Sequence, residues 1–430
     1  MSFKLIIFYY YLKYKFFMKI DNKEKLLSFQ KRKIKKHLDY ITKKSGYYSE
    51  YRGKELEDFP VIDKKIMMEN FDTVNTVGLS KDHALEIAMN SEKTRNFKEK
   101  YNNITVGLSS GTSGNRGLFI ISDFERAKWT GIILAKLLPD FILKKQKIAL
   151  FLRADSELYN SVNSKILKFR FFDMINDYKN NLKELDRFKP DILIAPASML
   201  KILADNIENI DIKPNSIFSC AEVLTEENRE YINRKFNKKI GEIYQATEGF
   251  LGYSYDSGQG LKINEDVLYI EKEYINNEKT RFIPVITDFE RKSQPVIRYR
   301  LNDIWIESRR SDGDFMILDK IEGREDDIFI LKSRDGKDIK IFPDFLRRAL
   351  MFSSGDIQEY NIIQKTFTDI EVSFIPRDYK DYDMIKEKIK ENLYGLFSTF
   401  DTDIQRINLT FSAYEKKNRL AKKRDIKREF

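Results

Sequence analysis

The middle of the chain alternates short apolar runs with segments of helical spacing. The apolar runs fall at residues 147–152, 169–172, 192–195, 216–219 and 240–244. Such alternation predicts a layered α/β domain whose sheet is largely parallel. Ligands of open parallel sheets lie at the carboxyl ends of the strands, and Thr247 and Glu248 follow the last of these runs. We therefore expect both side chains at a binding site.

The amino-terminal stretch, residues 3–18, is the most apolar part of the chain. Lys13 and Lys15 interrupt it before the roughly 20 apolar residues that a membrane span needs, and no small-residue cleavage site follows. We expect an amphipathic helix packed on the core. A weak contact with a membrane surface is the alternative. The protein is expected to be cytoplasmic.

Two further changes of pattern divide the chain into domains. Helical spacing dominates a lead-in at residues 1–60, and short strand-like runs between Asn, Gly and Asp turns dominate residues 265–322. We interpret the second region as a small β subdomain within an amino-terminal domain, residues 1–325. Residues 326–430 are expected to form a separate small α+β domain, with a turn at 333–336 and a helix at 343–351.

The stretch Leu108–Gly117 has the composition of a loop that holds a polyphosphate. Its glycines let backbone N–H groups approach a phosphate, and its Ser and Thr hydroxyls add donors. A short strand at 103–107 precedes the loop, and Ser122 or Asp123 can cap a long helix after it, an arrangement that favours an anion. The Walker A ending and the GxGxxG fingerprint are both absent, so a flexible surface turn is the alternative.

The composition excludes several classes of function. Lys and Arg number 77 against 67 Asp and Glu, but the excess of +10 is spread over the chain apart from residues 31–36 and the last dozen residues, which argues against nucleic acid. Cys220 is the one cysteine, and His37 and His83 are the two histidines. An internal disulfide is therefore excluded, and a Cys/His zinc site or a Ser-His-Asp triad is disfavoured. The chemistry must rest on phosphate electrostatics, carboxylates and metal.

Three further motifs follow the loop in order: Tyr244–Gly249, Ile297–Asp303 and Gly323–Asp327. With the loop, they resemble the four signature motifs of the adenylate-forming superfamily, which includes acyl-CoA synthetases, luciferases and peptide-synthetase adenylation domains. The sequence of the loop and the short length of the chain resemble those of the phenylacetate-CoA ligase and CoF-synthetase-like branch. The resemblance implies an α/β fold with a large amino-terminal domain, parallel-rich sheets and a small mobile α+β carboxyl-terminal domain.

The resemblance also assigns residues to the nucleotide. Those assigned to ATP binding are Ser109, Ser110, Gly111, Thr112, Ser113, Gly114, Ala221, Glu222, Tyr244, Thr247, Asp303 and Arg324. A carboxylate beside a triphosphate makes sense chiefly as a Mg²⁺ ligand, which is the role expected for Glu248. The carboxylate of Asp303 can accept hydrogen bonds from both ribose hydroxyls, with Arg324 as an added donor. An ordinary surface ion pair is the alternative for these two residues.

The chain departs from the family pattern at two cations. Arg116 stands where the family has a lysine after the loop, and a guanidinium is a planar fork where an ammonium is a point charge. Arg419 aligns with the carboxyl-terminal lysine that stabilises the adenylation transition state in the family, with Lys422 as a close substitute. The residues expected to act in catalysis are Thr247, Glu248, Arg419 and Lys422.

The resemblance implies an ATP- and Mg²⁺-dependent ligase that activates a small-molecule carboxylic acid as its acyl adenylate and releases pyrophosphate. The second step is left open between transfer to CoA, transfer to an amine and cyclisation of an N-acyl amino acid. The alternative from another class is a non-catalytic nucleotide-binding or membrane-surface protein that keeps the fold. The sequence indicates neither the acid nor the oligomeric state.

Overall fold

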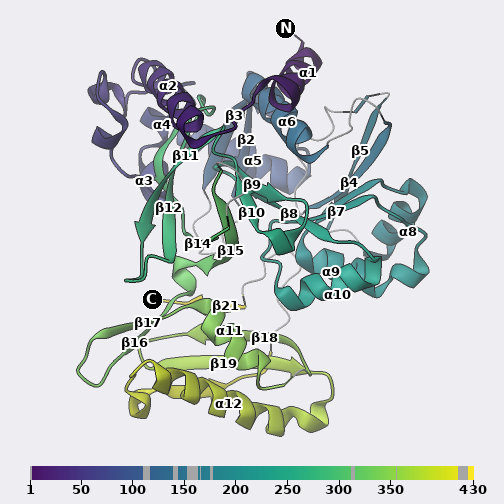
Figure 1. The fold of residues 1–430 in the computed structure, drawn as a ribbon, viewed down its shortest axis with the longest axis vertical. Helices are drawn as coiled ribbons and strands as arrows, with labels where there is room; N and C mark the ends of the chain where they lie inside the picture. The colour runs from purple at the N-terminus through teal and green to yellow at the C-terminus, as the bar shows by residue number, and fades with distance from the viewer. Residues whose placement is uncertain are drawn as a thin grey trace. The chain divides into compact units, whose positions relative to one another are not determined.

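The computed structural model describes residues 2–109, 117–138, 144–152, 163–164, 166–174, 178–310, 315–354, 356–414 and 425–430. The chain forms two compact units (Figure 1). The first unit comprises Met1–Glu273, Pro284–Leu301 and Glu307–Lys320, and the second comprises Tyr274–Ile283, Asn302–Ile306 and Ile321–Phe430.

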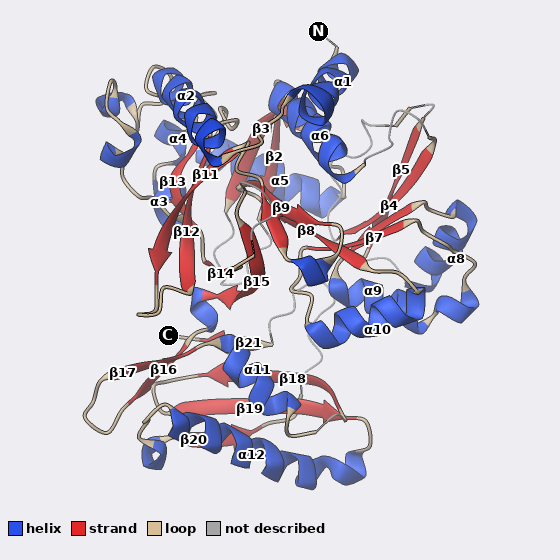
Figure 2. Ribbon diagram, in the orientation of Figure 1, coloured by secondary structure: helices blue, strands red, loops and turns tan. Residues whose placement is uncertain are grey.

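Five parallel strands form the centre of the first unit. They are β4 (Gln146–Leu152), β5 (Leu167–Asp173), β6 (Ile192–Ala195), β7 (Ser216–Cys220) and β8 (Ile240–Ala246). Their order is β5-β4-β6-β7-β8, and every neighbouring pair is parallel. Each strand coincides with one of the five predicted apolar runs, and the predicted mixed α/β fold is confirmed (Figure 2).

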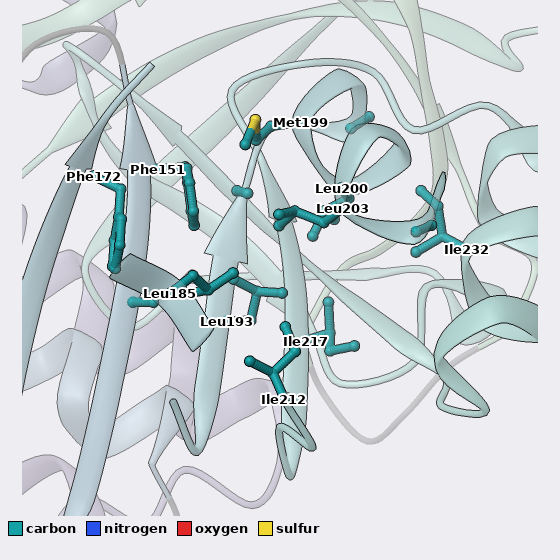
Figure 3. Close-up of a cluster of buried hydrophobic side chains, with 14 of the residues drawn as sticks. Phe151, Phe172, Leu185, Leu193, Met199, Leu200, Leu203, Ile212, Ile217 and Ile232 are labelled. Carbon is teal, nitrogen blue, oxygen red and sulfur yellow. The ribbon is translucent and has the colours of Figure 1, made fainter. Parts of the chain in front are cut away.

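Helices cover these parallel strands and complete a hydrophobic core. They are α8 (Tyr178–Phe188), α9 (Ala197–Asp205) and α10 (Glu226–Phe236). Leu200 and Leu203 of α9 lie with Leu193 of β6 in one buried cluster (Figure 3), where Phe151 and Phe172 stack with their ring centroids 4.7 Å apart. Each such side chain stabilises the fold by about 1.5–3 kcal/mol relative to exposure, so this packing fixes the strand ends that carry the candidate site.

Antiparallel strands extend the same twelve-stranded sheet. They are β9 (Gly249–Ser254), β10 (Leu261–Ile263), β11 (Leu268–Tyr274), β12 (Arg281–Asp288), β13 (Val296–Arg300), β14 (Asp303–Glu307) and β15 (Ile317–Arg324). Strand β9 returns beside β8, and β13 pairs with β12. The strand-dense pattern of this region is confirmed, whereas β9, which contains two glycines, the three-residue β10, and β14 were not predicted.

A three-stranded antiparallel sheet carries the candidate phosphate loop. Its strands are β1 (Lys100–Tyr101), β2 (Ile104–Leu108) and β3 (Leu118–Ser122), and α5 (Lys81–Thr94) packs against it. Helix α6 (Asp123–Leu137) follows β3 directly. The predicted cap is confirmed at Ser122, whose side chain accepts from the N–H of Glu125 while the Glu125 carboxylate accepts from the N–H of Ser122.

The amino terminus is helical, as predicted. It contains α1 (Phe3–Leu12), a π-helical turn η1 (Lys13–Phe17), α2 (Lys23–Ile41), α3 (Lys64–Glu69) and α4 (Phe71–Val74). Helix α1 lies along α6 (Figure 1), and a Cβ added to Gly131 of α6 would stand 2.5 Å from the carbonyl oxygen of Ile7. Only glycine permits this close approach. Among the described residues, no helix is long and apolar enough to cross a membrane.

The second unit contains a four-stranded sheet, a hairpin and two long helices. Its elements are β16 (Phe329–Lys332), β17 (Asp338–Ile341), α11 (Pro343–Met351), β18 (Ile357–Gln364), β19 (Asp369–Pro376), α12 (Tyr382–Thr399), β20 (Asn408–Phe411) and β21 (Ile426–Arg428). The sheet order is β20-β19-β18-β21, and side chains from α11, α12 and the sheet share one core. The turn predicted at 333–336 joins β16 to β17, and the predicted helix 343–351 is α11.

Candidate active site

Thr247 and Glu248 form the two-residue turn of a hairpin at the carboxyl end of β8. Ala246 pairs with Gly249 across the turn, so the chain reverses at once into β9. Gly249 has φ +157°, and a Cβ there would stand 3.0 Å from Oδ2 of the buried Asp288. A larger residue would crowd this carboxylate, which explains why a glycine ends the motif. The sequence-based expectation that the motif lies at a strand end is confirmed.

The carboxylate of Glu248 lies beside two hydroxyl groups. Thr247 Oγ1 donates to Glu248 Oε2 at 2.9 Å, and Tyr299 on β13 lies close enough to the same carboxylate to feel its charge. Burial raises the pKa of Tyr299 well above its ordinary value, and the negative charges of Glu248 and Asp63 raise it further. The hydroxyl of Tyr299 therefore keeps its proton at any physiological pH, and it can donate toward Glu248. Sequence reasoning placed Tyr299 within a motif but did not connect it to Glu248.

The segment before α3 brings a second carboxylate, that of Asp63, to this region. The N–H of Ile62 donates to the carbonyl of Arg298 at 3.0 Å, and the N–H of Arg300 donates to the carbonyl of Ile62 at 2.8 Å. This backbone pairing holds Ile62 beside β13 and so places Asp63 within the electrostatic reach of Tyr299. Asp63 also accepts from the N–H of Ile66 at 2.8 Å, and this hydrogen bond caps α3.

Lys64, the first residue of α3, lies at the base of the glycine-rich loop. The ends of the loop pair with each other, since the N–H of Ser109 donates to the carbonyl of Gly117 at 2.7 Å and Ser109 Oγ accepts from the N–H of Gly117 at 2.8 Å. A Cβ added to Gly117 would stand 2.8 Å from Cε of Lys64. No local pattern predicts this role for Lys64, because the residue is distant from the loop in the chain.

Arg291 connects the Glu248 turn to the strand that leaves the loop. Its Nη1 donates to the carbonyl of Thr247 at 2.9 Å, and its Nη2 donates to the carbonyl of Ile120 on β3 at 3.3 Å. Gln294 adds a second link to β3, since its Oε1 accepts from the N–H of Ile120 at 2.8 Å. Both side chains are buried, and neither was predicted. Burial raises the pKa of the neighbouring Asp288 to about 7, although the positive charge of Arg291 opposes this shift.

Ala221 and Glu222 follow β7, the strand beside β8. The register pairs Cys220 with Ile243, so this segment lies at the same sheet edge as the Glu248 turn. Ala221 has φ +62°, in the left-handed region, and Glu222 accepts a hydrogen bond from the N–H of Ser198 in the first turn of α9 at 3.0 Å. Tyr244 is half-buried on β8. The structure thus brings together the predicted residues of both segments.

In the second unit, the two remaining motifs meet. Arg324 Nε and Asp303 Oδ1 are 3.6 Å apart, and both side chains are partly exposed. Asn302 donates from Nδ2 to Asp326 Oδ2 at 2.8 Å, and the N–H of Glu325 donates to the carbonyl of Asn302 at 2.8 Å. The segment after β15 is therefore tied to the start of β14.

The remaining predicted site residues lie outside the described residues. They are Ser110, Gly111, Thr112, Ser113, Gly114, Arg116, Arg419 and Lys422.

The polar groups around Glu248 suit a Mg²⁺ ion that arrives with a nucleotide. In the part of the chain that the structure describes, no three His, Cys, Asp or Glu side chains form a metal cluster. Mg²⁺ needs none, because it is usually held by one or two carboxylates together with substrate phosphates and water. Glu248 is a carboxylate held in a fixed orientation, which fits this pattern.

Comparison with known proteins supports the same reading. No family model matches the chain. Protein CapK of Staphylococcus aureus is 24% identical over 405 residues, which cover 87% of this chain and 84% of that protein. Phenylacetate-coenzyme A ligase of Pseudomonas putida is 28% identical over 180 residues, which cover 38% of this chain and 39% of that protein.

Two solved structures share the fold over nearly the whole chain. A 2-hydroxyisobutyryl-CoA ligase in complex with 2-HIB-AMP superposes with a TM-score of 0.61 at 16% identity, covering 94% of this chain and 88% of that one. The GH3.15 acyl acid amido synthetase superposes with a TM-score of 0.57 at 12% identity, covering 92% and 90%. The resemblance indicated by the four motifs is therefore confirmed: the chain has the fold of the adenylate-forming ligases, and its sequence likeness includes the phenylacetate-CoA ligase branch.

Proposed function

We propose that this protein is an adenylate-forming ligase, which activates a carboxylic acid as its acyl adenylate and releases pyrophosphate from ATP. The observation that carries the proposal is the fixed carboxylate of Glu248, which lies in the turn after β8, at the sheet edge where Ala221 and Glu222 follow β7. A carboxylate is a poor acyl donor, because its leaving group would be oxide. Attack on the α-phosphorus of ATP turns that oxygen into part of a phosphate ester, provided that the phosphates are gripped and neutralised.

The residues of the first unit would hold the phosphates and the adenine. Ser109 and the glycine-rich loop would bind the β- and γ-phosphates, and Lys64 would add a positive charge at the base of the loop. When ATP binds, the Thr247 hydroxyl would turn from Glu248 and donate to the α-phosphate, while Arg291 holds the Thr247 carbonyl in place. Tyr244 would stack on adenine beside the backbone of Ala221 and Glu222. Glu248 would hold Mg²⁺, which neutralises triphosphate charge when bound.

The second unit would bind the ribose and supply the last cation. Asp303 would accept from the vicinal hydroxyls, with Arg324 as a donor to the same sugar. Residues from about 326 onward would move as a domain, with Arg419 or Lys422 reaching the reacting phosphate in one pose. The double variant Arg419→Ala with Lys422→Ala should then abolish adenylate formation while ATP affinity stays within a few fold. It keeps β21, whose Ile426 lies in the core of the second unit and which deletion of the residues after Asn418 would remove. Unchanged adenylation by the double variant would exclude both cations.

The acceptor in the second step is proposed to be CoA or an amine, with internal cyclisation of an N-acyl amino acid as a further route. The relatives support this range, since one structural neighbour is a CoA ligase crystallised with 2-HIB-AMP and CoA and another is an acyl acid amido synthetase. The substrate of this chain would be a small-molecule acid.

A pyrophosphate-release assay over a panel of carboxylic acids tests the proposal directly. We expect release that depends on ATP, Mg²⁺ and one class of acid, together with an acyl adenylate detectable by mass. The proposal would be contradicted if the protein binds ATP but releases no pyrophosphate. This must hold for every acid of a broad panel and for extracts that contain the natural acid.

A further inference from the structure

The amino-terminal helix is apolar on two faces, and one of them is exposed. Ile6, Ile7 and Tyr11 are buried against the body of the first unit. The exposed side chains lie on another face at spacings of three and four residues, and the turn η1 continues the row. The exposed large apolar residues are Leu5, Phe8, Tyr9, Phe16 and Phe17. We call these five residues the apolar stripe. Phe17 is 78% exposed, which is far more than a core position allows.

The apolar stripe belongs to a well-packed element, so its exposure does not reflect a loose terminus. Gly131 lets α1 approach α6 until their backbones nearly touch. The N–H of Met18 donates to the carbonyl of Lys13 at 2.8 Å, the wide bond of a π-helical turn. This turn adds a residue to the helix and leaves Phe16 and Phe17 on the outside. A rigid scaffold therefore presents the stripe.

Positive charge surrounds the apolar stripe. Residues 2–20 contain Lys4, Lys13, Lys15 and Lys19 and no acidic residue. Lys13 also lies near Arg32 and Lys33 of α2, whose positive charges add to burial in lowering the pKa of Lys13. Contiguous exposed apolar surface with a polar rim is typical of an interaction site rather than of ordinary surface.

We propose that the apolar stripe docks this protein onto an anionic lipid bilayer. Aromatic and aliphatic side chains would enter the boundary between headgroups and acyl chains, and the lysines would meet the lipid phosphates. Lysine suits this position, because its long stem follows the apolar surface while its ammonium group stays in water.

Charge distinguishes the bilayer from a second copy of the chain as the occupant. A two-fold pairing of this surface would set the lysines of one stripe against those of the other, and like charges oppose such a contact. An anionic surface instead complements the four lysines, which are the charged residues between positions 2 and 20. The proposal does not depend on the proposed enzymatic function.

Vesicle co-sedimentation with the full chain tests the proposal. We expect binding to vesicles of equimolar phosphatidylcholine and phosphatidylglycerol that is at least about tenfold tighter than binding to phosphatidylcholine alone, and that weakens as salt rises. The double variants Phe16→Ser with Phe17→Ser, and Leu5→Ser with Tyr9→Ser, should each bind about tenfold more weakly. The double variant Lys15→Gln with Lys19→Gln should lose most of the salt dependence.

Matched controls separate docking from general stickiness and from misfolding. Phe352→Ser removes a phenylalanine that is 82% exposed in the second unit, and it should bind vesicles as the unchanged protein does. Thermal melts should be similar for all variants, because every altered side chain of the stripe is exposed. The proposal is overturned if the unchanged protein stays in the supernatant with anionic vesicles at low salt, or if both stripe variants bind the vesicles as tightly as the unchanged protein does. A dimer in solution that Phe16→Ser with Phe17→Ser converts to a monomer would also overturn it, since a second copy would then cover the stripe.

Discussion

Glu248 is proposed to hold Mg²⁺ and Asp303 to hold the ribose, and the surroundings of the two carboxylates differ. Glu248 sits in a two-residue turn, accepts from Thr247, lies close to Tyr299, and follows a carbonyl that Arg291 holds. Asp303 is partly exposed and faces Arg324 across 3.6 Å, in an ion pair that solvent weakens. The first carboxylate is positioned before any ligand arrives, whereas the second can adjust to one. We therefore expect chemistry to be sensitive to Glu248 and affinity to be sensitive to Asp303.

The largest effect should come from Glu248→Gln. Glutamine keeps the shape and can still accept from Thr247, but it carries no negative charge to neutralise Mg²⁺. Turnover in the pyrophosphate-release assay should fall on the order of a hundredfold or more, and its dependence on Mg²⁺ should change. Unchanged turnover and unchanged Mg²⁺ dependence would remove Glu248 from the proposed site.

Glu242→Gln, on the strand that leads to Glu248, is a matched control for Glu248→Gln. It also yields a prediction about how stability depends on pH. Burial raises the pKa of Glu242 to about 7, against the opposing positive charge of Arg229. The folded protein thus keeps a proton that the unfolded chain loses near its ordinary pKa of 4.5, so Glu242 makes the protein less stable as pH rises from about 4.5 to 7. Glu242→Gln should be more stable than the unchanged protein by about 2 kcal/mol above this window and similar below it.

Urea unfolding on either side of that pH window measures the difference. Glu230→Gln, at an exposed position of α10, should show no such pH dependence relative to the unchanged protein. Equal stability of Glu242→Gln and the unchanged protein at both pH values would show that Glu242 is not protonated in the fold. In the pyrophosphate-release assay, turnover by Glu242→Gln should stay near that of the unchanged protein.

Lys64→Ala extends the comparison to a residue that no motif contains. Loss of a charge at the base of the loop should weaken ATP binding about tenfold, in the range of one charge-assisted hydrogen bond. The neighbouring Lys65 has a side chain that is 81% exposed, and its Nζ lies 4.0 Å from Oε1 of Glu69. Lys65→Ala is therefore the control, because it removes the same charge from a position away from the loop. Equal ATP affinities of the two variants by calorimetry would argue against a role for Lys64.

Asp303→Asn should have the smallest effect. One ribose hydrogen bond would weaken, so ATP affinity should fall only several fold while maximal turnover changes little. Asp338→Asn, in the hairpin of the same unit, should leave both quantities unchanged. A fall in turnover as large as that of Glu248→Gln would show that Asp303 is as strictly positioned as Glu248.

Sequence patterns predicted the parts of the fold that local order determines. Apolar runs marked all five parallel strands, and a capping side chain marked the start of α6. Helix α2 lies within the predicted helical lead-in, but the pattern did not predict its end at Ile41, where Thr42 Oγ1 donates to the carbonyl of Leu38 at 2.8 Å. Propensity alone could not place that end.

The residues that sequence reasoning missed are those joined over long separations in the chain. Tyr299 reaches Glu248, Lys64 reaches Gly117, and Arg291 reaches Ile120. Each contact depends on how β13, α3 and β3 pack, and no local pattern encodes that packing. The hydrogen bonds between Ile62 and β13 were missed for the same reason, because no local pattern relates the segment before α3 to that strand.

The left-handed backbone of Ala221 limits how this position can vary in evolution. A side chain in that conformation costs roughly 1–2 kcal/mol, which glycine would avoid. Glycine would also give the unfolded chain more freedom, at a cost of roughly 0.5–1 kcal/mol. The first term is the larger, so Ala221→Gly should stabilise the protein slightly, by up to about 1 kcal/mol. β-branched residues should be rejected at this position. Evolution should therefore restrict position 221 to alanine, glycine and the few other residues that tolerate a left-handed backbone.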